Sequence, residues 1–161
     1  DQKSGALFYL TRDPAGSGVV GTTIGWDGST SLTVNGSKQK QLFSSPIASW
    51  RPSVVNGQTI LLESPADDVP GYAYMLKAGT LVSFEGPSPG LDIAVHPSEN
   101  ALLYSVSAGG TIALFAQIGK KAPVQLPIKT IAENCAWLAD KSLTAYYAFP
   151  TAIPSTHFLN N

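Results

Sequence analysis

An internal repeat constrains the fold of this chain more than any other feature of its sequence. Three segments align when Trp50, Val95 and Trp137 are superposed, at spacings of 45 and 42 residues. Each segment leads through a polar turn into an apolar run. The three runs are Thr59–Leu62, Ala101–Val106 and Leu143–Phe149. A period of about 40–45 residues with four strands per repeat is typical of a β-propeller blade.

Further strand-like segments complete four short strands per repeat. They lie at residues 6–11, 19–26, 40–44, 72–76, 80–84, 111–118 and 124–128, with another predicted near His157–Leu159. Helical periodicity is absent, so we expect almost no helix. The predicted fold class is all-β, a β-propeller portion of about three and a half four-stranded antiparallel blades. A β-sandwich of similar strand count is the alternative.

The predicted blades form a single partial propeller domain that spans residues 1–161. Their approximate ranges are 6–45, 46–89, 90–130 and 131–161, the last being incomplete. The first blade lacks its first strand. Propellers usually close with about 4–8 blades, so we expect another chain, or further blades of the same protein, to complete the ring. Residue 1 is Asp and not Met, which also predicts a processed product or a fragment.

Composition excludes several classes of protein. Only 13% of residues are charged and the net charge is −1, which argues against a nucleic-acid partner. No apolar stretch approaches the roughly 18–20 residues that span a membrane. Cys135 is the one cysteine and lies in an apolar context, so we expect a buried thiol, or else a disulfide to a cysteine outside this sequence. Low charge and many small polar residues favour an extracytoplasmic location.

The repeated turns carry a resemblance to known proteins. Trp50-Arg51-Pro52-Ser53, Val95-His96-Pro97-Ser98 and Trp137-Leu138-Ala139-Asp140 resemble the W-S-P-D-G turn of TolB-like and WD40-like propeller repeats. Residues 7–11 and 133–137 are similar to segments of envelope-anchored bacterial propellers of unassigned function. The resemblance implies a propeller fold and brings no catalytic residues with it.

Catalytic candidates are few. Asp92 and His96 are four residues apart on a predicted strand and therefore share one face, where a carboxylate can orient an imidazole base. Ser98 or Ser105 would then supply a nucleophile. The structural alternative is stronger, because the repeats place unlike residues, Arg51 and Leu138, in the His96 slot. We therefore predict no catalytic residue and keep Asp92 and His96 as weak candidates.

Other motifs favour turns over ligand sites. Gly16–Gly21 matches G-x-G-x-x-G, but a strand-like segment follows where a dinucleotide site needs a helix. Asp67 and Asp68, near Glu63, are weak candidates for a Ca²⁺ site. The alternative interpretation is that they form the polar tip of a hairpin. Asp27-Gly28 is a second carboxylate candidate and a common hairpin turn. No metal and no cofactor are predicted.

The sequence therefore predicts a non-catalytic extracytoplasmic binding or scaffold module with a protein or glycan partner. One alternative is a propeller-type hydrolase or lyase with its site at the central channel. Another is a structural assembly subunit that a second chain completes. Exposed aromatic side chains gathered on one face would indicate the binding module.

Overall fold

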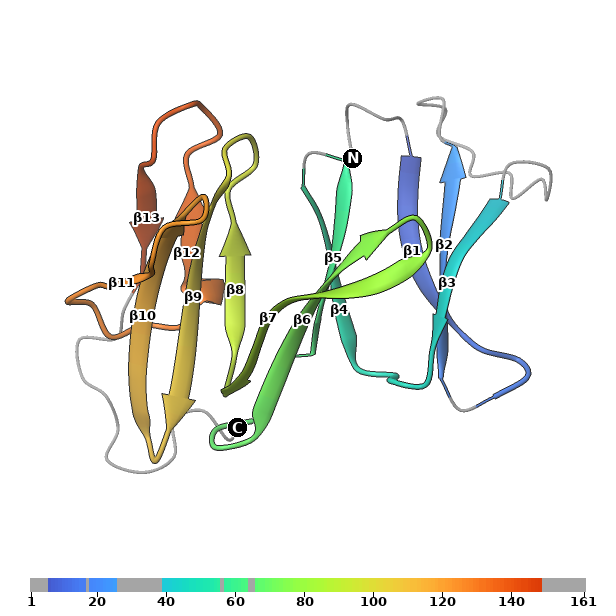
Figure 1. The fold of residues 1–161 in the computed structure, drawn as a ribbon, viewed down its shortest axis with the longest axis horizontal. Helices are drawn as coiled ribbons and strands as arrows, with labels where there is room; N and C mark the ends of the chain where they lie inside the picture. Colours follow the sequence, from blue (N-terminus) through green and yellow to red (C-terminus); the bar gives the residue numbers. More distant parts are fainter. Residues whose placement is uncertain (1–5, 17, 26–38, 56, 64–65, 149–161) are drawn as a thin grey trace. The chain divides into compact units, whose positions relative to one another are not determined.

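A computed structural model describes residues 6–16, 18–25, 39–55, 57–63 and 66–148 (Figure 1). These residues form antiparallel β-strands and one short 3-10 helix, without any α-helix. The predicted all-β class is therefore confirmed. The predicted strand near His157–Leu159, the Asp27-Gly28 turn and Trp26 lie outside the described residues.

The first sheet has three strands in the order β1-β2-β3. They are β1 (Ala6–Arg12), β2 (Val19–Gly25) and β3 (Gln39–Ser45). The register of β2 and β3 shifts at Gly21, where a Cβ would lie 2.1 Å from the Phe43 ring. Only glycine lets that ring pack directly on the strand.

The second and third sheets each have four strands. The second has the order β4-β5-β6-β7, and the third has the order β11-β10-β9-β8. Their strands are β4 (Trp50–Val55), β5 (Gln58–Glu63), β6 (Pro70–Lys77), β7 (Thr80–Pro89), β8 (Asp92–Val95), β9 (Ala101–Ala108), β10 (Thr111–Ile118) and β11 (Val124–Gln125). Strand β9 is buried along almost its whole length, which explains its continuous apolar run.

A two-stranded sheet follows, which we call the terminal hairpin. It pairs β12 (Cys135–Trp137) with β13 (Ala145–Tyr147), and the 3-10 helix η2 (Ala132–Asn134) leads into it. Each sheet lies within one of the predicted blade ranges. Successive sheets of this kind are compatible with a propeller-like fold, but no sheet of the described residues closes. A single partial propeller domain stays a prediction.

Strand β11 is shorter than predicted. We expected residues 124–128 to form the outer strand of the third sheet, but β11 ends at Gln125. Prolines flank it at positions 123 and 127. Because proline has no N–H to donate, it ends the ladder on both sides.

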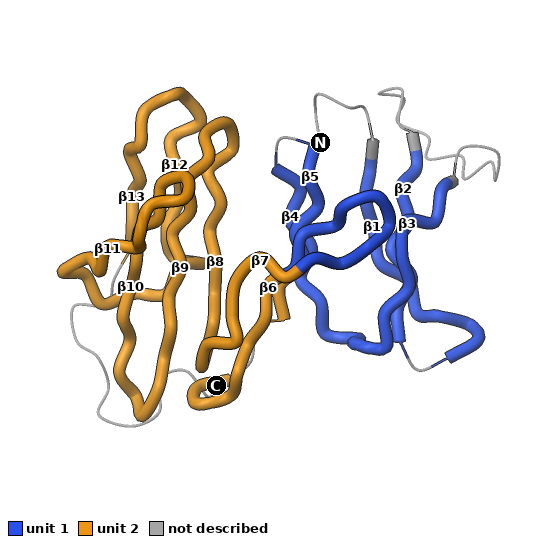
Figure 2. The backbone as a smooth tube through the Cα atoms, viewed as in Figure 1, with its two compact units in different colours: residues 1–61, 74–82 blue, residues 62–73, 83–161 orange. Residues whose placement is uncertain are grey.

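The chain divides into two compact units (Figure 2). Unit 1 comprises residues 1–61 and 74–82, and unit 2 comprises residues 62–73 and 83–161. In unit 1 the first sheet packs on parts of the second through Val19, Phe43, Trp50 and Leu61. The Trp50 ring meets Tyr74 edge to face at 5.6 Å between centroids.

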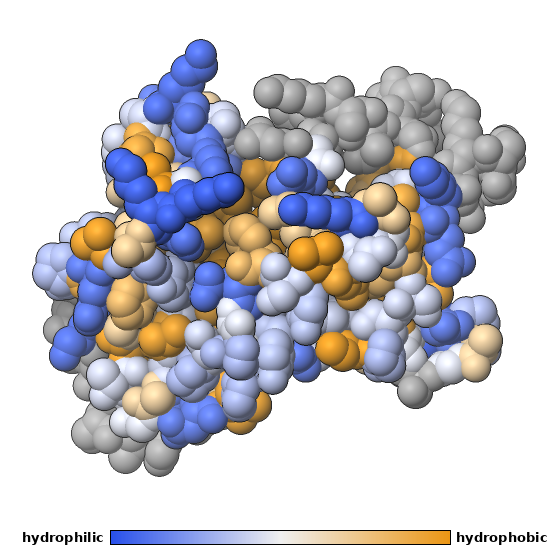
Figure 3. Space-filling model, viewed as in Figure 1, coloured by the Kyte–Doolittle hydropathy of each residue, from blue (hydrophilic) through white to orange (hydrophobic). Residues whose placement is uncertain are grey.

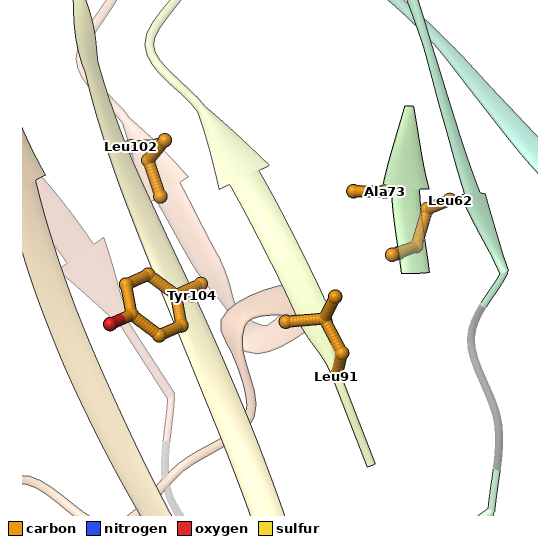
Figure 4. Packing of buried hydrophobic residues seen from close by; sticks show 5 residues of the cluster. All are labelled: Leu62, Ala73, Leu91, Leu102 and Tyr104. Carbon is orange, nitrogen blue, oxygen red and sulfur yellow. The ribbon is translucent and has the colours of Figure 1, made fainter. Parts of the chain in front are cut away.

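Unit 2 contains two apolar cores. The first joins parts of the second sheet to the third through Leu62, Ala73, Leu91, Leu102 and Tyr104 (Figure 4). The other joins the opposite face of the third sheet to the terminal hairpin, around Leu103, Leu114 and Ala132. The third sheet is thus covered on both faces, as a blade between two neighbours would be.

The turn between β6 and β7 offers a stabilising substitution. Both turn residues have positive φ, 48° at Ala78 and 82° at Gly79, which a two-residue hairpin of this twist requires. Alanine is strained there, so we expect Ala78→Asn to raise the free energy of unfolding by about 0.5–1 kcal/mol. Urea unfolding measures this change in the free energy of unfolding. Ala122→Asn, at an exposed position outside the turn, is the control. An unchanged or lowered stability of the Ala78 variant would contradict this turn geometry.

Candidate functional site

Of the candidate catalytic residues, Asp92 begins β8 and His96 directly follows it, and both contact the segment that follows the third sheet. Asp92, Ala94 and His96 alternate along the chain, so all three point the same way. Each is hydrogen-bonded to a different part of η2 or the terminal hairpin. We call this set of three contacts the β8 latch.

His96 forms the first contact of the latch and is completely buried. Its Nδ1 accepts the backbone N–H groups of Ser98 at 3.1 Å and Glu99 at 2.9 Å. The proton of the neutral ring therefore sits on Nε2, which donates to the Ser142 carbonyl at 2.9 Å. The Trp137 ring lies against the imidazole at 4.9 Å between centroids. His96 thus closes its own turn and holds the loop of the terminal hairpin.

Asp92 forms the second contact at the other end of β8. Its side chain is 5% exposed, and Oδ2 accepts the backbone N–H of Glu133. Ser105, paired with Asp92 across β8 and β9, accepts the N–H of Ala132 at 2.9 Å. The two side chains therefore take up backbone donors in the first turn of η2, which have no partner within the helix.

Trp137 forms the third contact, from the hairpin side. Its indole Nε1–H donates to the Ala94 carbonyl at 2.9 Å. The rest of the ring packs against the core formed by Leu103, Leu114 and Ala132. This tryptophan fixes β12 to β8 by a polar contact and an apolar one at the same time.

The structure does not bring the catalytic candidates together as a pair. The two side chains share a face, as predicted, but a strand rise of about 3.3 Å per residue separates their Cα atoms by about 13 Å. Ser98 Oγ donates to the Asp140 carbonyl at 3.0 Å. Ser105 Oγ faces η2, as described above. In this fold all four side chains hold backbone groups of the chain itself.

The metal candidates, Asp67 and Asp68, hold a turn of the third sheet. Asp68 Oδ1 accepts the N–H of Gly109 at 2.7 Å, and Asp67 Oδ2 accepts the N–H of Gly110 at 2.9 Å. Both glycines have positive φ, as the two-residue turn between β9 and β10 requires. Within the described ranges, no group of three or more His, Cys, Asp and Glu side chains could hold a metal ion.

The glycine motif lies in a hairpin. Gly16 belongs to the turn between β1 and β2, and Gly18 directly precedes β2. A Cβ at Gly18 would lie 1.8 Å from the Ser45 carbonyl oxygen, so close backbone approach explains this glycine. The glycines lead into strand β2, as the sequence predicts, and not into the helix that a dinucleotide site needs.

Cys135 lies beside the latch and is only partly exposed. Burial raises the pKa of its thiol above the ordinary value, and the nearby Asp92 carboxylate raises it further. Its S–H group lies 3.8 Å from the Ile131 carbonyl oxygen, which can accept it.

The raised pKa predicts slow alkylation of Cys135. The thiolate is the reactive form, so less of it is present in the folded protein at a given pH. We expect iodoacetamide to react several-fold more slowly with folded than with urea-unfolded protein at pH 8, and the folded rate to rise only at higher pH. Mass spectrometry gives both rates without ambiguity, since the chain has one cysteine. Identical pH profiles in the two states would refute the prediction.

Sequence reasoning missed the partners of these side chains. The Ser142 carbonyl and the Gly109–Gly110 amides are backbone groups, and no residue type signals them. The one signal available in the sequence was the predicted shared face of Asp92 and His96.

No protein-family model matches this chain, and neither curated proteins nor solved structures give a match. The described residues form no helix long and apolar enough to cross a membrane.

Proposed function

We propose that this protein is a non-catalytic binding or scaffold module of the cell exterior or envelope, built from propeller-like sheets of the TolB-like and WD40-like kind. The observation that carries the proposal is the use of its polar side chains. Asp92, Asp67 and Asp68 accept backbone N–H groups of neighbouring segments, and His96 accepts those of its own turn and donates to the Ser142 carbonyl. These polar side chains stabilise the fold itself, which leaves the exposed surface for binding.

The surface of unit 2 supplies the binding part of the proposal. Apolar side chains reach the surface between polar ones in the space-filling view (Figure 3). Tyr146 is 66% exposed and Leu138 is 38% exposed, both on the terminal hairpin. Exposed aromatic and aliphatic side chains gathered on one element mark interaction sites.

A protein partner fits this surface better than a glycan. Tyr146 and Tyr147 are consecutive strand residues, so their side chains point to opposite faces of the hairpin. They cannot form one aromatic platform for a sugar ring. Each face therefore carries one exposed tyrosine, and on the Tyr146 face such a ring near the exposed Leu138 suits a protein contact.

Site-specific photo-crosslinking tests the binding proposal. A benzophenone amino acid replaces Tyr146 in the full chain, expressed in its native host, and replaces Val124 on β11 as the control. Val124 is 63% exposed, so both probes reach solvent. We expect one discrete protein adduct at position 146 that is absent at position 124. No adduct at position 146, or the same adducts at both positions, would contradict the proposal.

The proposed location has its own test. A Val124→Cys variant in a Cys135→Ala background carries one exposed thiol. A membrane-impermeant maleimide is expected to label it in intact cells or in cells with only the outer envelope opened. Labelling that requires lysis of the inner membrane would place the protein in the cytoplasm and overturn this part of the proposal.

A further inference from the structure

The first sheet has one strand fewer than each of the two sheets that follow it. Strand β1 forms one edge of this sheet, and among the described residues only β2 pairs with it (Figure 1). The repeat predicts that the first blade lacks its first strand, which is the strand that would lie on the open side of β1. The edge of β1 is therefore a candidate contact surface.

The exposure of β1 lies at its edge and not on the face of the sheet. Leu7 is 42% exposed, whereas its partner on β2, Ile24, is 6% exposed. Tyr9 is half-buried, whereas its partner Thr22 is 8% exposed. Cross-strand partners share one face of a sheet. That face is therefore covered over β2, and the open side of β1 is the side away from β2.

The backbone register shows which groups of β1 point away from β2. The Asp13 N–H donates to the Gly18 carbonyl at 2.9 Å, at the end of the ladder between β1 and β2. Hydrogen-bonded pairs alternate along an antiparallel ladder, so every second residue before Asp13, including Tyr9, bonds β2. Phe8 and Leu10 therefore direct their N–H and C=O groups outward, where a further strand would bond them.

Other edge strands of the molecule are protected against pairing, and β1 is not. Proline, which cannot donate to a ladder, lies in or directly beside four of them. These are β3 with Pro46, β4 with Pro52, β7 with Pro87 and Pro89, and β11 with Pro123. Strand β1 has 7 residues, no proline, and no charged residue before Arg12. An edge of this kind readily pairs with another strand.

The edge of β1 is complementary to itself. An antiparallel second copy of β1, centred on Tyr9, places Phe8 opposite Leu10 of that copy, so the outward backbone groups of the two strands meet. The same register places Arg12 opposite Ala6, so no like charges face one another. The two Tyr9 side chains then lie directly opposite each other as an aromatic cross-strand pair.

We propose that β1 of one molecule pairs antiparallel with β1 of a second copy, about a two-fold axis at Tyr9. The contact is isologous, because the same strand serves on both sides, and it closes as a dimer. A single pair of strands buries little surface, so the dimer is weak, in the range of transient contacts. This surface differs from the terminal hairpin, so the inference goes beyond the proposed binding function.

Sedimentation velocity on the full chain tests the inference over about 1–500 μM. We expect the mean mass to rise toward that of a dimer. The proposed register places Leu7 opposite Thr11 of the second copy. Leu7→Lys with Thr11→Lys therefore sets like charges opposite each other and should raise the dissociation constant about tenfold. Leu7→Lys with Thr11→Glu is the matched control, which sets opposite charges there and should dimerise like the unchanged protein.

Disulfide trapping gives a readout that does not depend on these charges. In a non-hydrogen-bonded antiparallel pair the Cα atoms lie about 4.5 Å apart, which a disulfide can bridge. Tyr9→Cys in a Cys135→Ala background should therefore form a covalent dimer on mild oxidation. Thr11→Cys in the same background is the control, because its two copies would lie about 13 Å apart. Circular dichroism confirms that each variant is folded.

Several outcomes would overturn the inference. A monomer at every concentration is one of them. Equal weakening by both charge variants, or equal trapping at positions 9 and 11, are others, because a register centred on Tyr9 predicts a difference in each comparison. Trapping at position 9 decides the question if the lysine variants fail to fold. Photo-crosslinking at position 146 probes another surface, so a failure of this inference and a failure of the proposed function are distinguishable.

Discussion

Replacing His96 by alanine is expected to lower the free energy of unfolding by about 3–5 kcal/mol. The imidazole is fully buried and bonds three backbone groups: the N–H groups of Ser98 and Glu99 and the carbonyl of Ser142. Alanine leaves them without that partner and opens a cavity beside Trp137. Urea unfolding of the full chain measures the loss. A decrease below about 1 kcal/mol would contradict the latch, since exposed substitutions give values of that size.

His96→Asn is the matched variant. An asparagine oxygen can accept the same two N–H groups in the turn, but its side chain is too short to reach Ser142. We therefore expect a loss between zero and that of the alanine variant, with faster hydrogen exchange in the terminal hairpin than in β9 and β10. Equal losses for asparagine and alanine would show that the turn contributes nothing.

Leu114→Ala is expected to have the second large effect, a loss of about 2–5 kcal/mol. Leu114 is 1% exposed and lies in the core that joins the third sheet to the terminal hairpin. Removing the methine and two methyl groups of the leucine leaves a cavity that the flanking strands cannot fill. Differential scanning calorimetry and urea unfolding give the change in stability.

Leu114→Met serves as its control, because it keeps nearly the same volume and should cost less than about 1.5 kcal/mol. The double variant of His96→Ala and Leu114→Ala tests whether both side chains hold the same hairpin. Once the hairpin is released by one change, the second should cost less, so the summed single effects should exceed the double effect. Strict additivity would show that the polar and apolar contacts act independently.

The repeat was sufficient to predict the sheets, because a blade is built from local hairpins. Residues 111–118 form a strand with the predicted bounds, and the other predicted strands within the described residues differ at their ends. Strand β7 runs five residues past the predicted end at residue 84, and β11 ends three residues before the predicted end at residue 128, where two prolines outweighed the apolar pattern. The residue at which a strand ends depends on which backbone N–H and C=O groups find a partner, and an apolar pattern does not indicate this.

The candidate site could be predicted only in part. Period-two alternation predicts that Asp92 and His96 share one face, and in the structure both side chains contact η2 or the terminal hairpin. Their partners could not be predicted, because the side chains bond backbone atoms about 40 residues further along the chain. In the sequence, an Asp and a His four residues apart suggest a catalytic pair. In an extended chain, however, that spacing keeps the two side chains too far apart to interact.

The state of the His96 ring tests the central claim most directly, which is that this histidine joins two parts of the fold. Long-range proton–nitrogen correlation spectra of the full chain report the tautomer, and the His96→Asn variant distinguishes its signals from those of the one other histidine. We predict that the ring proton lies on Nε2 and exchanges slowly with solvent. A proton on Nδ1, or a ring that exchanges freely, would contradict the claim, because Nδ1 could not then accept the two backbone N–H groups.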